Sequence, residues 1–188
     1  MGQLIYWTNI SLDGFIEDES GSFGWSEPDE EVHRFVNQRF AQIGTSLYGR
    51  RLYETMIFWE DPANVASEVD YVAEFGPIWR DSDKVVYSTT LEAVASERTR
   101  IEREFDPSAV RALKAEADND VVVGGAELAA HALRAGLVDE LHFYVVPVIV
   151  GGGKRALPPG WQSSLQLQEE HRFAAGWVFL RYTLNQLG

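Results

Sequence analysis

The chain has 188 residues, 45% hydrophobic and 12% aromatic, so length and composition predict a single folded domain with a sizeable core. Its formal net charge of −13 argues against nucleic acid or an anionic membrane as partner, because both are bound through clustered Lys and Arg. The absence of cysteine excludes disulfides, thiolate catalysis and Cys-ligated metals. With no signal-peptide pattern and no apolar run near the roughly 20 residues of a membrane span, we expect a soluble, cytoplasmic protein.

Strand and helix patterns alternate along the chain. Expected strands are Gln3–Asn9, Thr45–Tyr48, Lys84–Ser88, Arg98–Glu104, Asp120–Val123, Glu140–Val150, Leu165–His171 and Trp177–Leu184. Expected helices are Asp29–Ile43, Arg50–Ile57, Asn64–Arg80 with an end near Gly76-Pro77, Pro107–Ala117 and Leu128–Ala135, and Ser11–Pro28 is expected to be a loop. The alternation predicts an α/β fold with a central mixed, mostly parallel sheet and helices on both faces. The short connection between the last two strands predicts a C-terminal antiparallel hairpin.

Two glycines follow the all-valine strand in the stretch DVVVGGAEL. Gly124 and Gly125 are expected at the carboxyl end of that strand, where ligands of open α/β sheets collect. They could serve packing, as a tight turn, or let a phosphate approach the first helix amides, near Ala126, Glu127 and Leu128. The pair by itself leaves both alternatives open.

Two more strand ends carry chemistry suited to phosphate. Gly49 precedes Arg50 and Arg51 at a helix start, where arginine opposes the helix dipole unless an anion binds there. Ser88 and Thr89 place hydroxyls directly after another strand. The alternative role of these hydroxyls is a simple turn, and the alternative role of the two arginines is in salt bridges. Taken together, the three strand ends predict an elongated phosphorylated ligand along one edge of the sheet.

The motifs SLDGFI, LYGRRLYE, VVYST, VVVGGAEL and LVDELHFYVVPVIVGGG, in this order, resemble the dihydrofolate reductase superfamily. The likeness is greatest to the reductase domain of bacterial riboflavin biosynthesis, the RibD C-terminal domain family, and covers nearly the whole chain. It implies a central mixed sheet with flanking helices and NADPH as hydride donor. The resemblance implies that Gly49 and Arg50 form the cofactor-phosphate turn, and that Ser88 and Thr89, beside Arg50 and Arg51, bind the adenosine 2′-phosphate. It implies that Gly124-Gly125 is a cis diglycine beside the nicotinamide and pyrophosphate. It also implies a mobile loop over the nicotinamide, formed by Asp13, Gly14, Phe15 and Ile16.

The chain departs from the family pattern at three places. Leu52 stands where the family often has a threonine whose hydroxyl helps hold the cofactor phosphate. The first-helix acid that holds the pterin in true dihydrofolate reductases aligns either with Glu30 or, counting back from Gly49, with His33. Tyr144 stands where those enzymes have a threonine near the substrate, so the pterin site is expected to be remodelled.

The function expected from these residues is an NADPH-dependent reductase of a small heterocyclic (pterin- or pyrimidinone-like) or carbonyl substrate. Tyr144, Glu30 or a bound water would supply the proton. The alternative is a non-catalytic nucleotide- or pterin-binding protein on the same fold. We expect no metal site, because the four histidines show neither HxxxH nor HxH spacing.

The long apolar strand Glu140–Val150 contains Pro147, which suits an edge strand. A bare apolar edge favours aggregation and should be covered, and the resemblance implies a second copy of the chain as the cover. The expectation is therefore a homodimer built around this strand and Gly151–Gly153. The alternative is that the C-terminal hairpin covers the strand instead.

Overall fold

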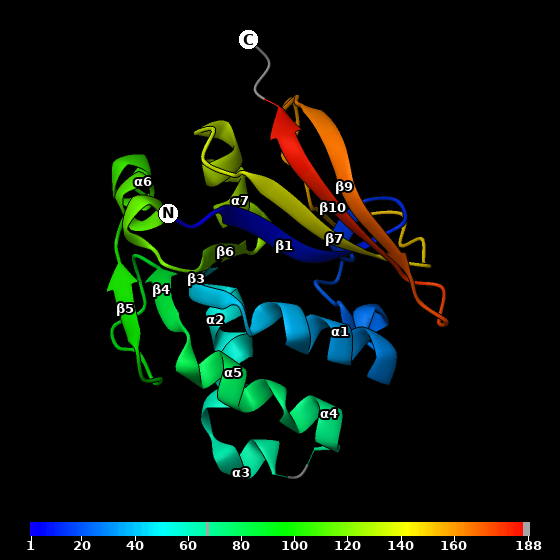
Figure 1. Cartoon of the computed structure of the whole chain (residues 1–188), viewed down its shortest axis with the longest axis horizontal. Coiled ribbons are helices and arrows are strands. Elements are labelled where there is room, and N and C mark those ends of the chain that lie inside the picture. The colour runs from blue at the N-terminus through cyan, green and yellow to red at the C-terminus, as the bar shows by residue number, and fades with distance from the viewer. Residues whose placement is uncertain (67, 186–188) are drawn as a thin grey trace.

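The computed structural model describes residues 1–66 and 68–185. Its main sheet has eight strands in the order β5-β4-β3-β6-β1-β7-β10-β9 (Figure 1). These strands are β1 (Leu4–Ser11), β3 (Ile43–Gly49), β4 (Asp83–Tyr87), β5 (Thr99–Glu102), β6 (Asp120–Gly124), β7 (Glu140–Val146), β9 (Ser164–Arg172) and β10 (Val178–Asn185). In this order, neighbouring strands from β5 through β7 pair in parallel, whereas β10 is antiparallel to both β7 and β9. The predicted mixed, mostly parallel sheet with a C-terminal antiparallel hairpin is confirmed.

Helices cover both faces of this sheet, as Figure 1 shows. They are α1 (Glu30–Phe40), α2 (Arg50–Met56), α3 (Pro62–Val65), α4 (Asp70–Ala73), α5 (Phe75–Asp81), α6 (Pro107–Glu116) and α7 (Ala126–Arg134), with 3-10 turns at Gly24–Ser26 and Ile57–Glu60. On one face, Val110 of α6 and Leu128 of α7 pack into a core with Leu4 and Val123. On the other face, helices α1, α2 and α5 bury Phe40, Tyr53 and Trp79 against the sheet.

Aspartate side chains cap the starts of two helices, α1 and α6. The Asp29 carboxylate accepts a hydrogen bond from the Val32 amide, and Asp106 does the same for Ser108 ahead of Pro107. Each carboxylate satisfies an amide that has no partner within the helix. Local sequence is therefore sufficient to place the starts of α1 and α6.

The prediction of one helix over Asn64–Arg80 was wrong. The structure breaks this segment into α3, α4 and α5, and Gly76 and Pro77 lie inside α5 rather than at a helix end. Pro77 is the third residue of α5, in the first turn, where a helix does not need the missing amide hydrogen. The proline is thus compatible with a helix start, a reading that the sequence pattern alone did not favour.

The Ser11–Pro28 segment is more ordered than a plain loop. Strand β2 (Phe15–Glu17) lies within it and pairs antiparallel with β8 (Lys154–Arg155). This small two-stranded ribbon, here called the β2–β8 ribbon, joins segments almost 140 residues apart in sequence (17 and 154). The sequence did not predict this ribbon.

Strand β7 is not an edge strand, so that part of the prediction was wrong. It ends at Val146, before Pro147, and lies between β1 and β10. The C-terminal hairpin covers it, which is the alternative considered for this strand. Proline can therefore follow β7 without interrupting its hydrogen bonds.

A buried polar network ties the hairpin to β7. The His142 ring nitrogen Nε2 lies 2.8 Å from a carboxylate oxygen of Glu140, and Arg181 of β10 lies 3.4 Å from the other oxygen. The hydrogen bond from His142 lowers the pKa of Glu140, which is almost fully buried. Arg181 also pairs with Glu169 of β9, and Glu169 pairs with Arg39 of α1. Buried charges need such partners, so the network fixes the hairpin against α1 and β7.

The homodimer remains a prediction. Because β7 is covered by the hairpin, the contact predicted around Glu140–Val150 and Gly151–Gly153 is replaced by one that we propose at β9. This strand forms one edge of the main sheet, and its Leu165 and Leu167 side chains are 40% and 47% exposed. Light scattering at micromolar concentration should give a mass near twice the 21.2 kDa of one chain. Changing Leu165 and Leu167 together to Lys should return the mass to that of one chain with an unchanged circular dichroism spectrum. A wild-type mass of one chain would show that the homodimer prediction is wrong.

Candidate functional site

The ends of three neighbouring strands lie on one transverse line of the sheet. Gly49 at the end of β3 is in register with Tyr87 at the end of β4, and Tyr48 is in register with Gly124 at the end of β6. Helix α2 starts directly after β3, with Gly49 as its N-cap, and α7 starts one residue after β6, with Gly125 as its N-cap. The structure therefore brings together the three strand ends singled out in the sequence.

Glycine is favoured at positions 124 and 125 for two different physical reasons. A side chain at Gly124 would place its Cβ 2.5 Å from Leu52 Cδ2, so this glycine allows α2 to pack closely. Gly125 has a φ of +85°, which favours glycine, and an added Cβ would meet nothing within 4 Å. The packing and ligand alternatives thus apply to different members of the pair. The expected cis bond between them is absent, because every peptide bond in the described chain is trans.

The first amides of α7 have no partner within the helix. The earliest helical hydrogen bond runs from the Ala129 amide to the Gly125 carbonyl, so the amides of Ala126, Glu127 and Leu128 precede it. Ala126 and Leu128 are buried, and Glu127 is exposed. These amides, next to the open space at Gly125, form a suitable environment for an anionic group.

The turn after β4 is built around Ser88. Its hydroxyl accepts hydrogen bonds from the amides of Thr90 (3.2 Å) and Leu91 (2.9 Å), which is the turn role weighed as an alternative. Arg50 Nη1 donates to Thr90 Oγ1 at 2.8 Å, and its Nε donates to Glu54 at 2.6 Å. Thr89 is exposed on the same turn. The turn therefore presents hydroxyls and one arginine together.

Arg103 is a second arginine at this turn, and the sequence analysis missed it. It donates to the carbonyl oxygens of Ser88 (2.9 Å) and Leu91 (2.7 Å). It follows β5 directly, and the parallel pairing of β5 with β4 brings it here. The pairing is the signal that was needed, because nothing in the local sequence marks Arg103.

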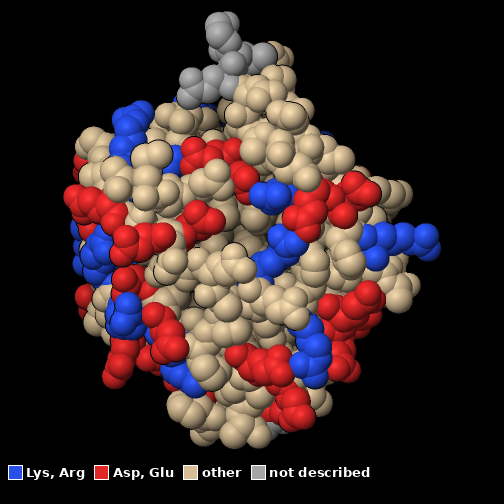
Figure 2. All heavy atoms as spheres, viewed as in Figure 1, with Lys and Arg blue, Asp and Glu red and all other residues tan. Residues whose placement is uncertain are grey.

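Arg51 points in another direction. Its Nη1 atom lies 3.9 Å from Glu17 of the β2–β8 ribbon rather than near Ser88. Lys154 of the ribbon, also missed by the sequence analysis, lies 3.0 Å from both Glu17 and Glu127. Figure 2 shows that acidic side chains lie beside Lys and Arg groups on the visible face of this acidic protein. Three cations at the sheet edge, Arg50, Arg51 and Lys154, follow the same pattern, since each has an acidic partner.

The Asp13–Ile16 segment is tied to the residues after β7. The Asp13 carboxylate accepts hydrogen bonds from the amides of Val150 (3.2 Å) and Gly151 (2.8 Å). A hydrogen bond with Ser11, together with these amides, holds the pKa of Asp13 below its ordinary value. The Gly14 carbonyl accepts from the Ala156 amide at 3.0 Å, and Phe15 is buried beneath the Arg155 guanidinium. Ile16 follows in β2, so the whole segment is held beside the sheet edge.

The two candidate first-helix residues lie in different environments on α1. Glu30 is exposed and pairs with Arg34 at 2.9 Å. His33 is packed among the rings of Trp59, Tyr71 and Phe75, and this burial lowers the pKa of its imidazole. Glu30 is therefore the accessible carboxylate. The surroundings of His33 favour the uncharged form of its imidazole.

Tyr144 lies in the aromatic core beneath α1. Its ring stacks on Trp7 with centroids 5.5 Å apart, and Phe35 and Phe179 close around it. It is fully buried, and among the described residues its hydroxyl has no hydrogen-bond partner. Burial raises the pKa of this phenol far above its ordinary value. Trp7, by contrast, is partly exposed.

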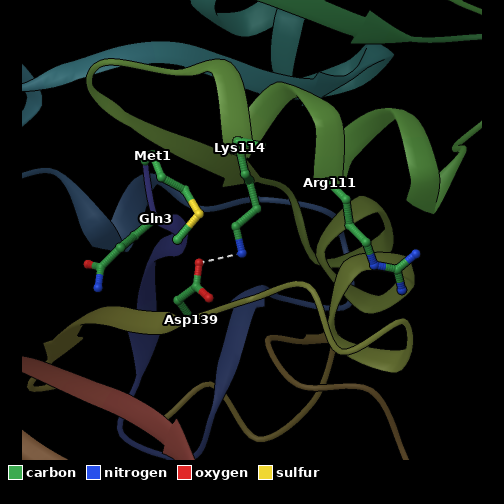
Figure 3. Close-up of a pocket in the computed structure, with 7 residues that line it drawn as sticks. Met1, Gln3, Arg111, Lys114 and Asp139 are labelled. Carbon is green, nitrogen blue, oxygen red and sulfur yellow. Dashed lines mark ion pairs between the residues drawn. The ribbon is translucent and has the colours of Figure 1, made fainter.

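A cavity of about 430 Å³ lies at the opposite edge of the sheet, near the start of β1 (Figure 3). Lys114 and Asp139 line it as an ion pair, with Nζ and Oδ2 2.5 Å apart. Asp139 also accepts from the Leu4 amide, and Lys114 donates to the Leu137 carbonyl. The polar atoms of Lys114 and Asp139 are therefore already paired. The cavity lies at the ends of the strands opposite to the starts of α2 and α7, so it is separate from the candidate site.

Within the described ranges, no helix is both long and apolar enough to cross a membrane.

Comparison with known proteins identifies the family. The model of the RibD C-terminal domain family matches residues 3–179, so the chain belongs to this family. The uncharacterized protein YyaP of Bacillus subtilis (strain 168) is 29% identical over 180 residues, covering 94% of this chain and 92% of YyaP.

Two solved structures share the fold. A pyrimidine reductase-like protein from Corynebacterium diphtheriae has a TM-score of 0.68 at 15% identity, over 98% of this chain and 92% of that protein. Dihydrofolate reductase from Enterococcus faecalis, complexed with NADP(H), has a TM-score of 0.66 at 13% identity, over 98% of both chains. The chain therefore has a reductase-type fold, like that of dihydrofolate reductase.

The different roles of the two glycines lead to a matched pair of substitutions. Gly124→Ala should lower the free energy of unfolding by about 1–3 kcal/mol, because its methyl group would overlap Leu52. Gly125→Ala should cost about 1–2 kcal/mol for the left-handed backbone, and should also impair binding of NADPH to the folded protein, because its methyl enters the open space before α7. Urea unfolding and NADPH titration of both variants measure the two effects. If folded Gly125→Ala binds NADPH as the wild type does, the ligand role of Gly125 is wrong.

Proposed function

We propose that this protein is an NADPH-dependent reductase that transfers a hydride to a small heterocyclic or carbonyl substrate. The observation that carries the proposal is the alignment of Gly49, Tyr87 and Gly124 at one sheet edge. This alignment puts two glycine-capped helix starts and a hydroxyl-bearing turn side by side. Such an edge suits a long ligand with several phosphates.

The residues present fit this cofactor. Open space lies in front of both Gly49 and Gly125, where a side chain would meet nothing within 4 Å. Arg50 and Arg103 border the Ser88 turn, and guanidinium groups match phosphate oxygens in pairs. These two arginines would hold a 2′-phosphate, and the α7 amides would hold the diphosphate. The NADP(H) complex of the E. faecalis neighbour supports the choice of cofactor.

When bound, the reduced nicotinamide supplies a hydride to an electrophilic carbon. The chain's own residues orient both reactants and limit the access of water. Asp13, through its bonds to Val150 and Gly151, holds the Asp13–Ile16 segment beside the sheet edge. For the proton, exposed Glu30 or a bound water is favoured over Tyr144, because the phenol is fully buried.

A planar heterocycle is the favoured substrate class. Trp7 offers a partly exposed aromatic surface on β1, supported from below by Tyr144. Aromatic faces bind planar rings by stacking. The C. diphtheriae neighbour, described as pyrimidine reductase-like, agrees with a pterin- or pyrimidinone-like ring.

A non-catalytic nucleotide- or pterin-binding protein is the second candidate. The observation that favours it is the combination of Leu52, which packs on Gly124 and offers no hydroxyl to a phosphate, with the buried Tyr144. Such a protein would bind NADPH or a pterin without turnover. Catalysis therefore has to be measured separately from binding.

The proposed activity can be tested by following NADPH absorbance with a panel of pterins, pyrimidinones and quinones. We expect at least one member to accelerate NADPH oxidation in proportion to enzyme concentration. Glu30→Gln should reduce the rate if this carboxylate delivers the proton, while Glu31→Gln on the same helix turn serves as control. NADPH binding without turnover on any member would favour the non-catalytic alternative.

Cofactor choice provides a separate prediction. Pairing of Arg50 and Arg103 with the 2′-phosphate should be worth about 1.5–3 kcal/mol, so NADPH should bind roughly 10- to 150-fold more tightly than NADH. Arg50→Met and Arg103→Met should each reduce that ratio, whereas Arg111→Met, at the opposite edge of the sheet, should not. Nicotinamide fluorescence titrations measure both affinities. Equal wild-type affinities would contradict the assignment of this 2′-phosphate site.

A further inference from the structure

Four charged side chains form a continuous path between the starts of α2 and α7. Arg51 at the start of α2 lies 3.9 Å from Glu17, and Lys154 lies 3.0 Å from Glu17. The same Lys154 Nζ lies 3.0 Å from Glu127, the second residue of α7. The path crosses the edge through the β2–β8 ribbon, so the ribbon is held by charge between the two helix starts.

The two acidic partners of Lys154 differ in exposure. The Glu127 side chain is 81% exposed, whereas that of Glu17 is 18% exposed. An exposed ion pair contributes little to stability, so Glu127 can turn into solvent at small cost. Glu17 is held within the ribbon by β2 and has less freedom. Lys154 can therefore exchange one partner while keeping the other.

The position of Glu127 makes such an exchange necessary if an anion binds before α7. A carboxylate in the first turn suits the dipole of the free helix, but it repels a diphosphate at the same amides. Lys154 is the cation already in contact with that carboxylate. If it moves to the diphosphate, it replaces an acidic partner with a stronger anionic one.

We propose that Lys154 is a binding residue for the diphosphate of the cofactor, exchanging Glu127 for phosphate oxygens while it keeps Glu17. Binding would then draw the β2–β8 ribbon, which carries Phe15 and Ile16, toward the nicotinamide end of the site. This inference rests on the proposed function. It assigns a role to a lysine that none of the sequence motifs marked.

The test uses three ligands and a matched control. Lys154→Met should weaken NADPH and NADH by the same factor, roughly tenfold or more, because both carry the diphosphate. Calorimetry with 2′-AMP, which has the 2′-phosphate and no diphosphate, should show no change. Lys154→Arg should stay within a few-fold of the wild type, and Arg134→Met, in the last turn of α7, should leave all three affinities near the wild-type values.

Two acidic substitutions separate ligand binding from simple anchoring of the ribbon. Glu127→Gln should tighten NADPH and NADH several-fold, because it removes the competing carboxylate. If Lys154 only anchors the ribbon through Glu17, Glu17→Gln should weaken NADPH and NADH as much as Lys154→Met does, and that result would overturn the inference. Unchanged NADPH affinity in Lys154→Met would also overturn it. Failure of the wild type to bind either NADPH or NADH would instead refute the proposed function, and the inference with it.

Discussion

Helix α2 lies against the end of β6 at residue 124, which has no side chain. A Cβ there would come within 2.5 Å of the Leu52 Cδ2 methyl group, so the Leu52 side chain would have to shift. The start of α2 lies beside the start of α7, with Gly49 and Gly125 facing the same edge. The register of the neighbouring strands β3 and β6 sets the two helix starts side by side, and the missing side chain at residue 124 lets Leu52 of α2 pack on the end of β6.

The charge distribution at this edge imposes a second condition. In a chain of net charge −13, the edge cations have partners before any ligand binds: Arg50 pairs with Glu54, and Lys154 with Glu17 and Glu127. An anion that pairs with Arg50 or Lys154 must therefore displace an internal partner. The displacement costs little where the acid is well exposed, as Glu127 is, because water can replace the lost contact. Specific binding then comes from geometry rather than from an excess of positive charge.

The sequence predicted those features that depend on local pattern. Valine-rich β6, the glycines at 49, 124 and 125, and helices beginning near Asp29 and Pro107 all follow from neighbouring residues, and parallel topology places the strand ends at one edge. Features that depend on pairing between distant segments could not be predicted this way. The β2–β8 ribbon has too few residues to show a period, and Lys154 and Arg103 reach the site only through strand pairing. Whether β7 is covered by the hairpin or by a second copy is likewise decided by tertiary contacts.

Under the proposed function, the part of the site assigned to the substrate is less open than the part assigned to the cofactor. Along β7, His142 and Tyr144 face α1 with Trp7 of β1, and the rings of Phe35 and Phe179 fill the space between them. A reacting ring placed against Tyr144 would have to displace this packed cluster, which is costly in a close-packed interior. Stacking on the partly exposed Trp7 requires no such displacement. In a reductase built on this site, Tyr144 would therefore position Trp7 beneath the substrate rather than touch the reacting atoms, and the proton would come from the solvent side of α1.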